Sequence, residues 1–276
     1  MRFDWFGILL ILILVGAALW PVAQQRLLQL RRTGSLERFA RSRSTRAITL
    51  IARRETYRFL GLPLLRRDEL DAPEVVLRQI ARTPARTPID LILHAGPGHA
   101  LAAEQIAHAL IRHQARVTVF IPHQALGDSL LIALAADQVV LDPNAVLGPA
   151  TPWVGPYPAV SVLTAVRDKG LAQVDDRTLI LADQARKARA QVQALIAELL
   201  VARNPELEGV PELAAQLAGD SWTPYYPILI EEGRRLGLRL SDEFPPELYG
   251  LLDLYDTATT RRPTCAVAPL NPAELP

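Results

Sequence analysis

The stretch that decides the fold runs from residue 89 to residue 150 and reads IDLILHAGPGHALAAEQIAHALIRHQARVTVFIPHQALGDSLLIALAADQVVLDPNAVLGPA. Three short apolar runs within it have the length and β-branched content of buried strands: 89–93, Val117–Ile121 and Gln138–Leu141. A helical pattern follows each of the first two runs. Strands that alternate with helices predict an α/β domain with a parallel sheet at its core.

Two loops at the ends of the predicted strands direct attention to one edge of this sheet. The first reads HAGPGH from His94, and the second reads PHQALGD and contains His123. Parallel sheets bind their ligands at the carboxyl ends of the strands. We therefore expect a functional site where these two loops meet.

Length and composition limit the class of protein. The 276 residues suffice for one domain of roughly 200–250 residues with additional segments. The net charge of +1 argues against a general nucleic-acid binder. A single cysteine, Cys265, provides no disulfide framework, and no third ligand with metal-like spacing accompanies the two loop histidines. We therefore expect neither a metal nor a cofactor.

The N-terminus predicts a membrane anchor. After a tip at residues 1–4, residues 5–23 contain no charged side chain, and Trp5 and Trp20 stand near the ends of this run as interfacial anchors do. A cleaved signal peptide is the alternative, but no clear cleavage site follows. The arginine-rich linker at 24–46 places the following domain on the cytoplasmic face of the cell membrane by the positive-inside rule.

The soluble domain is predicted to occupy residues 47–255. It begins with a strand at 47–52 and contains a long helical pattern over Asp176–Arg203. Between these segments, the proline-rich stretch around Trp153 is typical of an ordered loop or a lid. The Pro-, Thr- and Ala-rich tail at 256–276 is predicted to be disordered.

The chain resembles the serine dehydrogenase proteinases, which are membrane-associated relatives of the Clp protease fold within the crotonase-like superfamily. The resemblance covers roughly residues 45–255. The segments that carry it are AITLI at 47–51, PIDLILH at 88–94, LAAEQIA at 101–107, VTVFIPH at 117–123, LIALAAD at 131–137, DPNAVLGP at 142–149 and LILAD at 179–183. The resemblance implies a Clp/crotonase-like parallel sheet with flanking helices, protein or peptide substrates and a homo-oligomer.

The resemblance also implies a catalytic site. In the family, a loop of the type H-T-P-G-G supplies a backbone N–H to an oxyanion hole. A second loop of the type H-Y-A-M-S-G-G-T carries the nucleophilic serine at a helix N-terminus, and a lysine from a later helix is the base. The helix N-terminus stabilises developing negative charge, and a desolvated lysine can accept the proton of the serine.

This sequence departs from that pattern in both loops. Gly127 stands at the position of the nucleophile, and glycine offers no nucleophilic atom. Ser129 is the displaced alternative, although two residues of helix turn a side chain by about 200°. In the first loop Pro97 has no N–H to donate. The backbone N–H groups of Gly98 and Asp128 are therefore the remaining oxyanion donors, and the Asp128 side chain is predicted to cap the following helix.

The other implied site residues have structural alternatives. Lys187 matches the position of the family base, but it is flanked by Arg186 and Arg189, which is also typical of a solvated helix face. His94 and His123 are expected to line the site through hydrogen bonds that fix the loops. His99, His108 and His113, which belong to or flank one predicted helix, are interpreted as surface residues.

Two functions follow from these residues. One is a membrane-anchored serine peptidase that acts on proteins or peptides at the cytoplasmic face, impaired by Gly127. The other is a pseudopeptidase that retains the fold as a binding or assembly module, gripping peptides by strand addition. An acyl-CoA enzyme of the crotonase type is disfavoured because it needs paired oxyanion N–H groups, and Pro97 removes one.

Overall fold

The computed structural model describes residues 5–51, 55–59, 62–67 and 72–256, with only the backbone described in much of the first helix and in the first hairpin. The helices are α1 (Trp5–Arg43), α2 (Ala72–Arg82), α3 (Ala100–Ile111), α4 (Ser129–Leu134), α5 (Ala159–Lys169), α6 (Asp176–Arg203), α7 (Val210–Leu217), α8 (Ile230–Arg235) and α9 (Glu247–Asp256), with a 3-10 turn at Leu171–Gln173. The strands of the main sheet are β1 (Arg46–Ile51), β4 (Ile89–His94), β5 (Val117–Ile121), β7 (Gln138–Leu141) and β11 (Leu240–Ser241). Short pairs are formed by β2 (Glu55–Phe59) with β3 (Leu62–Arg67), β6 (Gln124–Ala125) with β8 (Val146–Leu147), and β9 (Trp153–Val154) with β10 (Tyr157–Pro158).

The five strands of the main sheet are all parallel, in the order β1-β4-β5-β7-β11. Strands β4 and β5 lie at its centre, and nearly all of their residues are buried. Such continuous apolar strands are expected where helices cover both faces of a parallel sheet. The predicted α/β fold with a parallel core is thus confirmed.

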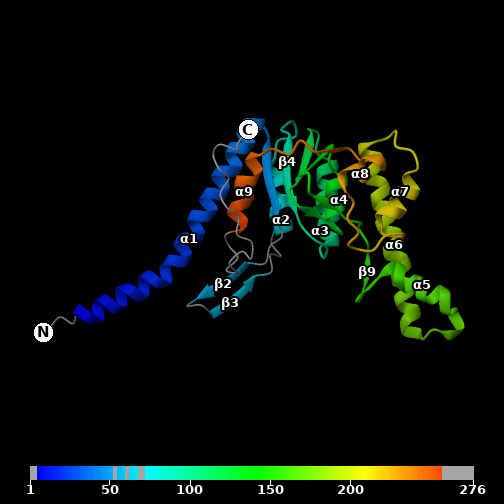
Figure 1. The fold of residues 1–276 in the computed structure, drawn as a ribbon, viewed down its shortest axis with the longest axis horizontal. Coiled ribbons are helices and arrows are strands. Elements are labelled where there is room, and N and C mark those ends of the chain that lie inside the picture. The colour runs from blue at the N-terminus through cyan, green and yellow to red at the C-terminus, as the bar shows by residue number, and fades with distance from the viewer. Residues whose placement is uncertain (1–4, 52–54, 60–61, 68–71, 257–276) are drawn as a thin grey trace, which may run out of the picture.

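Helices cover both faces of the sheet (Figure 1). On one face, α2, α3, α4 and α6 pack over a core that includes Ile106, Leu130 and Ile196. On the other face, α1 packs against α9 over a smaller cluster centred on Phe120 and Leu248. The sheet therefore separates a large core beneath α6 from a second core beneath the N-terminal helix.

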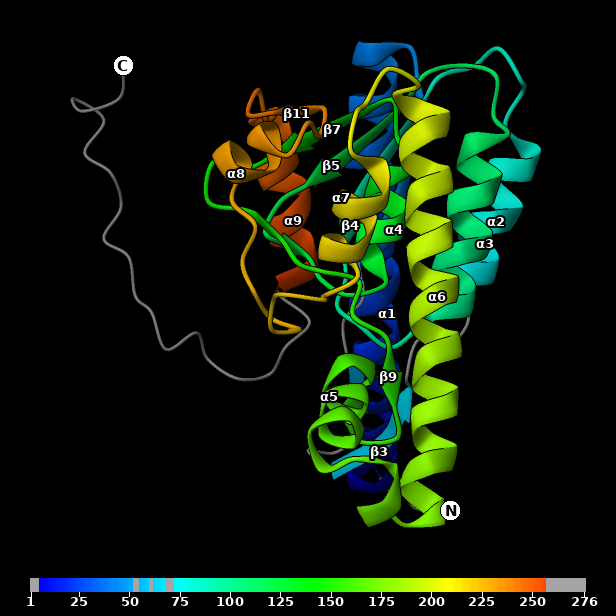
Figure 2. The same ribbon diagram turned by 90° about the vertical axis from the view of Figure 1, so that its right-hand side faces the viewer.

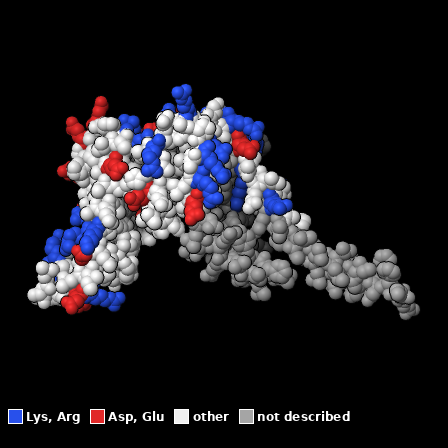
Figure 3. Space-filling model, turned by 180° about the vertical axis from the view of Figure 1, so that it is seen from behind, with Lys and Arg blue, Asp and Glu red and all other residues white. Residues whose placement is uncertain are grey.

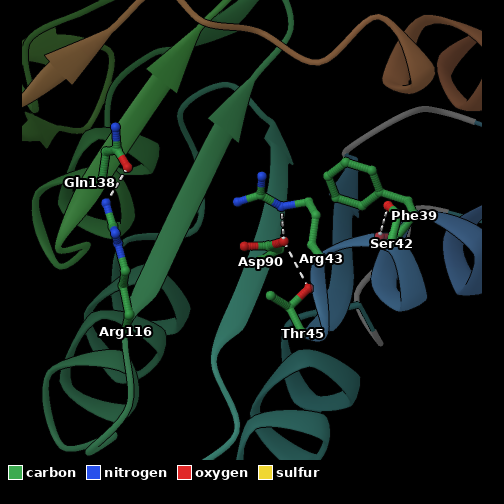
Figure 4. Close-up of polar contacts among 7 residues, drawn as sticks. All are labelled: Phe39, Ser42, Arg43, Thr45, Asp90, Arg116 and Gln138. Carbon is green, nitrogen blue, oxygen red and sulfur yellow. Dashed lines mark hydrogen bonds and ion pairs between the residues drawn. The ribbon is translucent and has the colours of Figure 1, made fainter.

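A buried carboxylate fixes the end of α1 to the sheet (Figure 4). Asp90 in β4 is 1% exposed and accepts hydrogen bonds from Arg43 Nε at 2.6 Å and Thr45 Oγ1 at 2.8 Å. The Arg43 guanidinium also lies over the rings of Phe39 and Phe120. Because a buried charge needs a partner, this cluster sets where the helix stops and the first strand starts.

Helix α6 extends beyond the body of the domain and, with α5 and the β9–β10 hairpin, forms a projecting lobe (Figure 2). The C-terminal end of α6 is fixed to the body of the domain by Arg203, which donates to the carbonyl oxygens of Ala135 and Leu110 and pairs with Asp137 at 2.7 Å. The lobe has its own small apolar cluster around Val162 and Ala182. The stretch around Trp153, expected to be a loop or lid, forms the hairpin of this lobe.

The N-terminal part of the chain forms one helix that joins the predicted anchor to the basic linker. Helix α1 runs without interruption over 39 residues. Across the residues that the structure describes, none of the helices is both long enough and apolar enough to cross a membrane. Most side chains of the predicted anchor at 5–23 lie outside this description, as do residues 1–4 and the tail at 257–276.

Candidate functional site

The two loops singled out in the sequence lie side by side at the carboxyl edge of the sheet. A β-bridge joins Ala95 of the first loop to Ala125 of the second, and Leu126 N donates to Ala95 O at 3.3 Å. The first loop leads into α3 and the second into α4. The helices therefore begin next to each other, and their first residues form the floor of the candidate site.

Gly127, at the position of the family nucleophile, has no room for a side chain. Its φ of +59° lies in the left-handed region, which favours glycine. A Cβ atom added there would lie 2.6 Å from Cβ of Pro97, far inside van der Waals contact. The two departures from the family pattern are therefore coupled, because Pro97 occupies the space that a serine at position 127 would need.

The Asp128 carboxylate occupies the backbone donors of the opposite loop. Its Oδ2 accepts hydrogen bonds from the N–H groups of Gly98 and His99, both at 3.0 Å. These amides open helix α3, where the partial positive charge of a helix N-terminus stabilises an anion. The prediction that the Asp128 side chain caps its own helix is wrong, since it makes no capping bond to α4. The predicted Gly98 oxyanion donor is already engaged.

Ser129 is buried in the core rather than presented at the loop surface. The residue is 4% exposed, and its Oγ donates to the carbonyl oxygen of Gly96 at 3.3 Å. Its neighbours Asp128 and Leu131 line the adjacent cleft, whereas Ser129 is not among the residues that do so. A nucleophile in this position would have to leave its hydrogen bond and its packing before reaching a substrate.

Lys187 lies on the solvent side of α6. Its Nζ donates to Asp183 Oδ2 at 2.6 Å, one helical turn away, and its side chain is 70% exposed. This hydrogen bond lowers the pKa of Asp183 below its ordinary value. Lys187 is absent from the set of described residues that line the cleft, although its neighbour Ala188 belongs to that set. The structure thus does not bring Lys187 together with Gly127 or Ser129.

The loop histidines contact each other at the sheet edge. The rings of His94 and His123 meet edge to face with their centroids 5.4 Å apart, which fits their expected place at the ends of neighbouring strands. His94 is half-buried and His123 is exposed. Among the residues covered by the structure, no group of three His, Cys, Asp or Glu side chains is placed to hold a metal ion.

A cleft of about 940 Å³ opens beside these loops, between the body of the domain and the lobe. Its walls come from the start of α3, from Asp128, from the β9 hairpin and from the middle of α6. Figure 3 shows the molecule hollowed between the lobe, at lower left, and the body. The cleft is large enough for several residues of an extended peptide.

Sequence reasoning missed most of the side chains that line this cleft. Glu104 and His108 project from α3, Glu198 comes from α6, and Tyr225 follows α7. The spacing of four residues between Glu104 and His108 places them on one helix face, and this was the available signal. Nothing local in the sequence indicates that α6 brings Glu198 opposite them.

Comparisons with known proteins identify the family and relatives of this chain. A family model for the ClpP-like SDH-type serine proteinases matches residues 2–274. Two uncharacterized proteins of Methanocaldococcus jannaschii are similar over most of their length. MJ0137 is 42% identical, covering 90% of this chain and 87% of the relative, and MJ1495 is 39% identical, covering 97% and 90%. The chain belongs to the ClpP-like SDH-type serine proteinase family.

Solved structures of ClpP-like proteases are also similar to this chain, at low identity. A point variant of ClpP1 from Listeria monocytogenes is 16% identical, with a TM-score of 0.48, covering 76% of this chain and 99% of that one. A variant of the 1510-N membrane-bound stomatin-specific protease, in complex with a substrate peptide, is 15% identical, with a TM-score of 0.45 and coverages of 75% and 77%. The predicted resemblance to the serine dehydrogenase proteinases is confirmed by the family model.

Proposed function

We propose that this protein is a peptide-binding member of its family that does not hydrolyse peptides by the serine–lysine mechanism. The observation that carries this proposal is the carboxylate of Asp128 on the amides of Gly98 and His99, next to a glycine at the nucleophile position. A negative charge already occupies the Gly98 amide, which hydrolysis would need as a donor to the charge developing on the substrate.

The residues at the positions of the serine mechanism do not favour hydrolysis. Acyl transfer needs an activated nucleophile, a base within hydrogen-bond reach and free donors for the oxyanion. Gly127 has no nucleophilic atom, Lys187 is committed to Asp183, and the Gly98 amide is committed to Asp128. A replaced nucleophile, a paired lysine and an occupied Gly98 amide together support the proposal more strongly than the single replacement at Gly127 would.

The cleft supports binding as the retained activity. It is open and bordered by strand β9, which pairs with β10 and carries no other strand on its free edge within the described residues. An extended peptide can add to such an edge through backbone hydrogen bonds while pockets take its side chains. The partner that fits is therefore a protein or peptide segment rather than a small metabolite.

We place this binding activity at the cytoplasmic face of the cell membrane. The support is the uncharged run at 5–23, followed by the arginine-rich segment at 24–46. The N-terminal end of α1 lies on the same lower side of the molecule as the carboxyl edge of the sheet in Figure 1. In a membrane-anchored protein, the cleft would thus face the bilayer and segments of chain that emerge from it.

Self-association is part of the proposal. Large apolar side chains are exposed on the lobe, among them Tyr157, Leu171 and Ile180. Exposed apolar patches are typical of protein interfaces. Sedimentation of the detergent-solubilised protein, beside a variant in which Leu171 and Ile180 are changed to serine, tests this part. A monomeric wild-type protein would contradict it.

The hydrolytic question is tested by labelling the full, detergent-solubilised chain with a fluorophosphonate probe. Cooperative thermal unfolding first shows that the protein is folded. We expect the probe to label neither the folded wild-type protein nor the Ser129→Ala and Lys187→Ala variants. An active serine hydrolase in the same tube controls for the probe. Labelling that disappears in Ser129→Ala would establish the competing function, a peptidase with a displaced nucleophile, and would overturn the proposal.

A further inference from the structure

The cleft carries three carboxylates, and its described lining includes no lysine or arginine. Asp128 lies at the loops, while Glu104 on α3 and Glu198 on α6 are 49% and 61% exposed. This negative lining contrasts with a net charge of +1 for the whole chain. A cleft lined by one sign of charge concentrates ligands of the opposite sign, so the charge pattern favours a cationic ligand.

An imidazole lies between two of these carboxylates without saturating them. His108 Nε2 is 3.8 Å from Glu104 Oε1, and its Nδ1 is 3.6 Å from Glu198 Oε1. Both distances exceed that of a hydrogen bond. The two glutamates, one from each wall, therefore keep acceptor positions for a donor that approaches them from the cleft.

The rest of the cleft fits a peptide that carries this donor. Trp153 and Tyr225 line the cleft and are 43% and 64% exposed, and aromatic faces attract a guanidinium group. Val192 and Leu195 supply an apolar strip along α6. A bare divalent ion fits less well, because no three ligating side chains converge among the residues described.

We propose that the cleft selects peptide segments with an arginine side chain, which pairs with Glu104 and Glu198 on the cleft side of His108. The planar guanidinium donates from several N–H groups at once, so it can bridge two carboxylates and still stack on an aromatic ring. Apolar residues that flank the arginine contact the strip on α6. This inference rests on the proposed function, because it names the class of peptide that the binding site takes.

The test is fluorescence anisotropy of the full chain in detergent at 0.15 M salt, where long-range attraction is screened. The probe is a fluorescein-labelled nine-residue peptide of alanine and valine with a central arginine. A matched peptide carries citrulline, which has nearly the same shape and no charge. We expect the arginine peptide to bind about tenfold more tightly, as expected for a desolvated charge pair.

Variants of the protein locate the effect. Glu104→Gln and Glu198→Gln should each weaken binding of the arginine peptide about three- to tenfold and leave the citrulline peptide unaffected. Glu206→Gln removes an exposed carboxylate that does not line the cleft, and it should change neither affinity. This control separates local recognition from the overall charge of the protein.

The outcomes distinguish the two proposals. Equal affinity for both peptides, or equal losses in all three variants, would overturn the arginine preference while peptide binding stands. Binding of neither peptide would contradict both proposals. Mass spectrometry of the recovered probe shows whether it is intact, and its cleavage would overturn the non-hydrolytic function without deciding the preference for arginine.

Discussion

Two aspartates at opposite ends of the central strands show how differently one side chain can be used. Asp90, near the start of β4, is 1% exposed and is neutralised by the Arg43 guanidinium and the Thr45 hydroxyl. Asp128, beyond the end of β5, is half-buried, borders an open cleft and accepts hydrogen bonds from two backbone amides. The Asp90 carboxylate fixes helix α1 to the sheet. The Asp128 carboxylate occupies the Gly98 amide, which was predicted to be an oxyanion donor.

The difference indicates where the fold tolerates change. A buried ion pair cannot lose one partner without leaving an uncompensated charge. A carboxylate on helix N-terminal amides needs no cation, and water or a ligand can replace it. We therefore expect substitutions at the Asp90 end to affect stability and substitutions at the Asp128 end to affect the site.

The largest effect is expected when the buried pair is broken. Asp90→Ala removes the partner of Arg43 and should lower the free energy of unfolding by about 3 kcal/mol, since Arg43 is partly exposed and regains some water. The matched control is Asp183→Ala, which removes an exposed pair on α6. The measurement is thermal unfolding followed by circular dichroism. Equal melting temperatures for the two variants would contradict the comparison.

The next effect concerns the space between Gly127 and Pro97. Gly127→Ala combines an unfavourable positive φ with a clash and should cost about 2–4 kcal/mol. Pro97→Gly in the same chain removes the clash and should recover about 1–2 kcal/mol, which a double-mutant cycle measures. Strictly additive effects would show that Pro97 is not what excludes a side chain at position 127.

A smaller effect is expected at Asp128. Asp128→Ala leaves the amides of Gly98 and His99 without their acceptor and should lower stability by about 1 kcal/mol. Asp128→Asn retains an acceptor oxygen and serves as the matched control. Hydrogen exchange at the two amides should accelerate in the alanine variant most, and unchanged protection would argue that the carboxylate does not hold them.

The smallest effect is expected at Lys187. Lys187→Met removes an exposed pair within one helix and should leave the stability at neutral pH nearly unchanged, because solvent screens the pair. Because the lysine lowers the pKa of Asp183, the contribution of the pair is present above about pH 4. It is lost as the pH falls through the lowered pKa, so wild type and variant should converge in acid. A large loss at neutral pH would mean that Lys187 has a second role.

The sequence predicts the fold and the location of the site for a clear physical reason. The runs over β4, β5 and β7 are apolar on both faces, and only a covered parallel sheet accommodates such strands. The loops after β4 and β5 must then meet at one edge. The absence of a nucleophile at position 127 can also be predicted from the sequence, because the prediction requires only the family resemblance and the identity of Gly127.

Contacts between distant segments were not predictable. The Asp128 side chain was expected to cap its own helix, yet it bonds to the start of α3, because the β-bridge from Ala95 to Ala125 holds the two loops together. Glu198 reaches the cleft only through the packing of the long helix α6 on α3 and α4. Local propensity carries no information on either contact.

The central claim is that the site holds peptides without cutting them, and one measurement tests it directly. The full chain is immobilised in detergent and equilibrated with a defined pool of peptides, and both the retained and the unbound fractions are sequenced by mass spectrometry. We predict that intact peptides are retained and that no new termini appear in either fraction. Fragments that accumulate with wild-type protein and disappear with Ser129→Ala would contradict the claim.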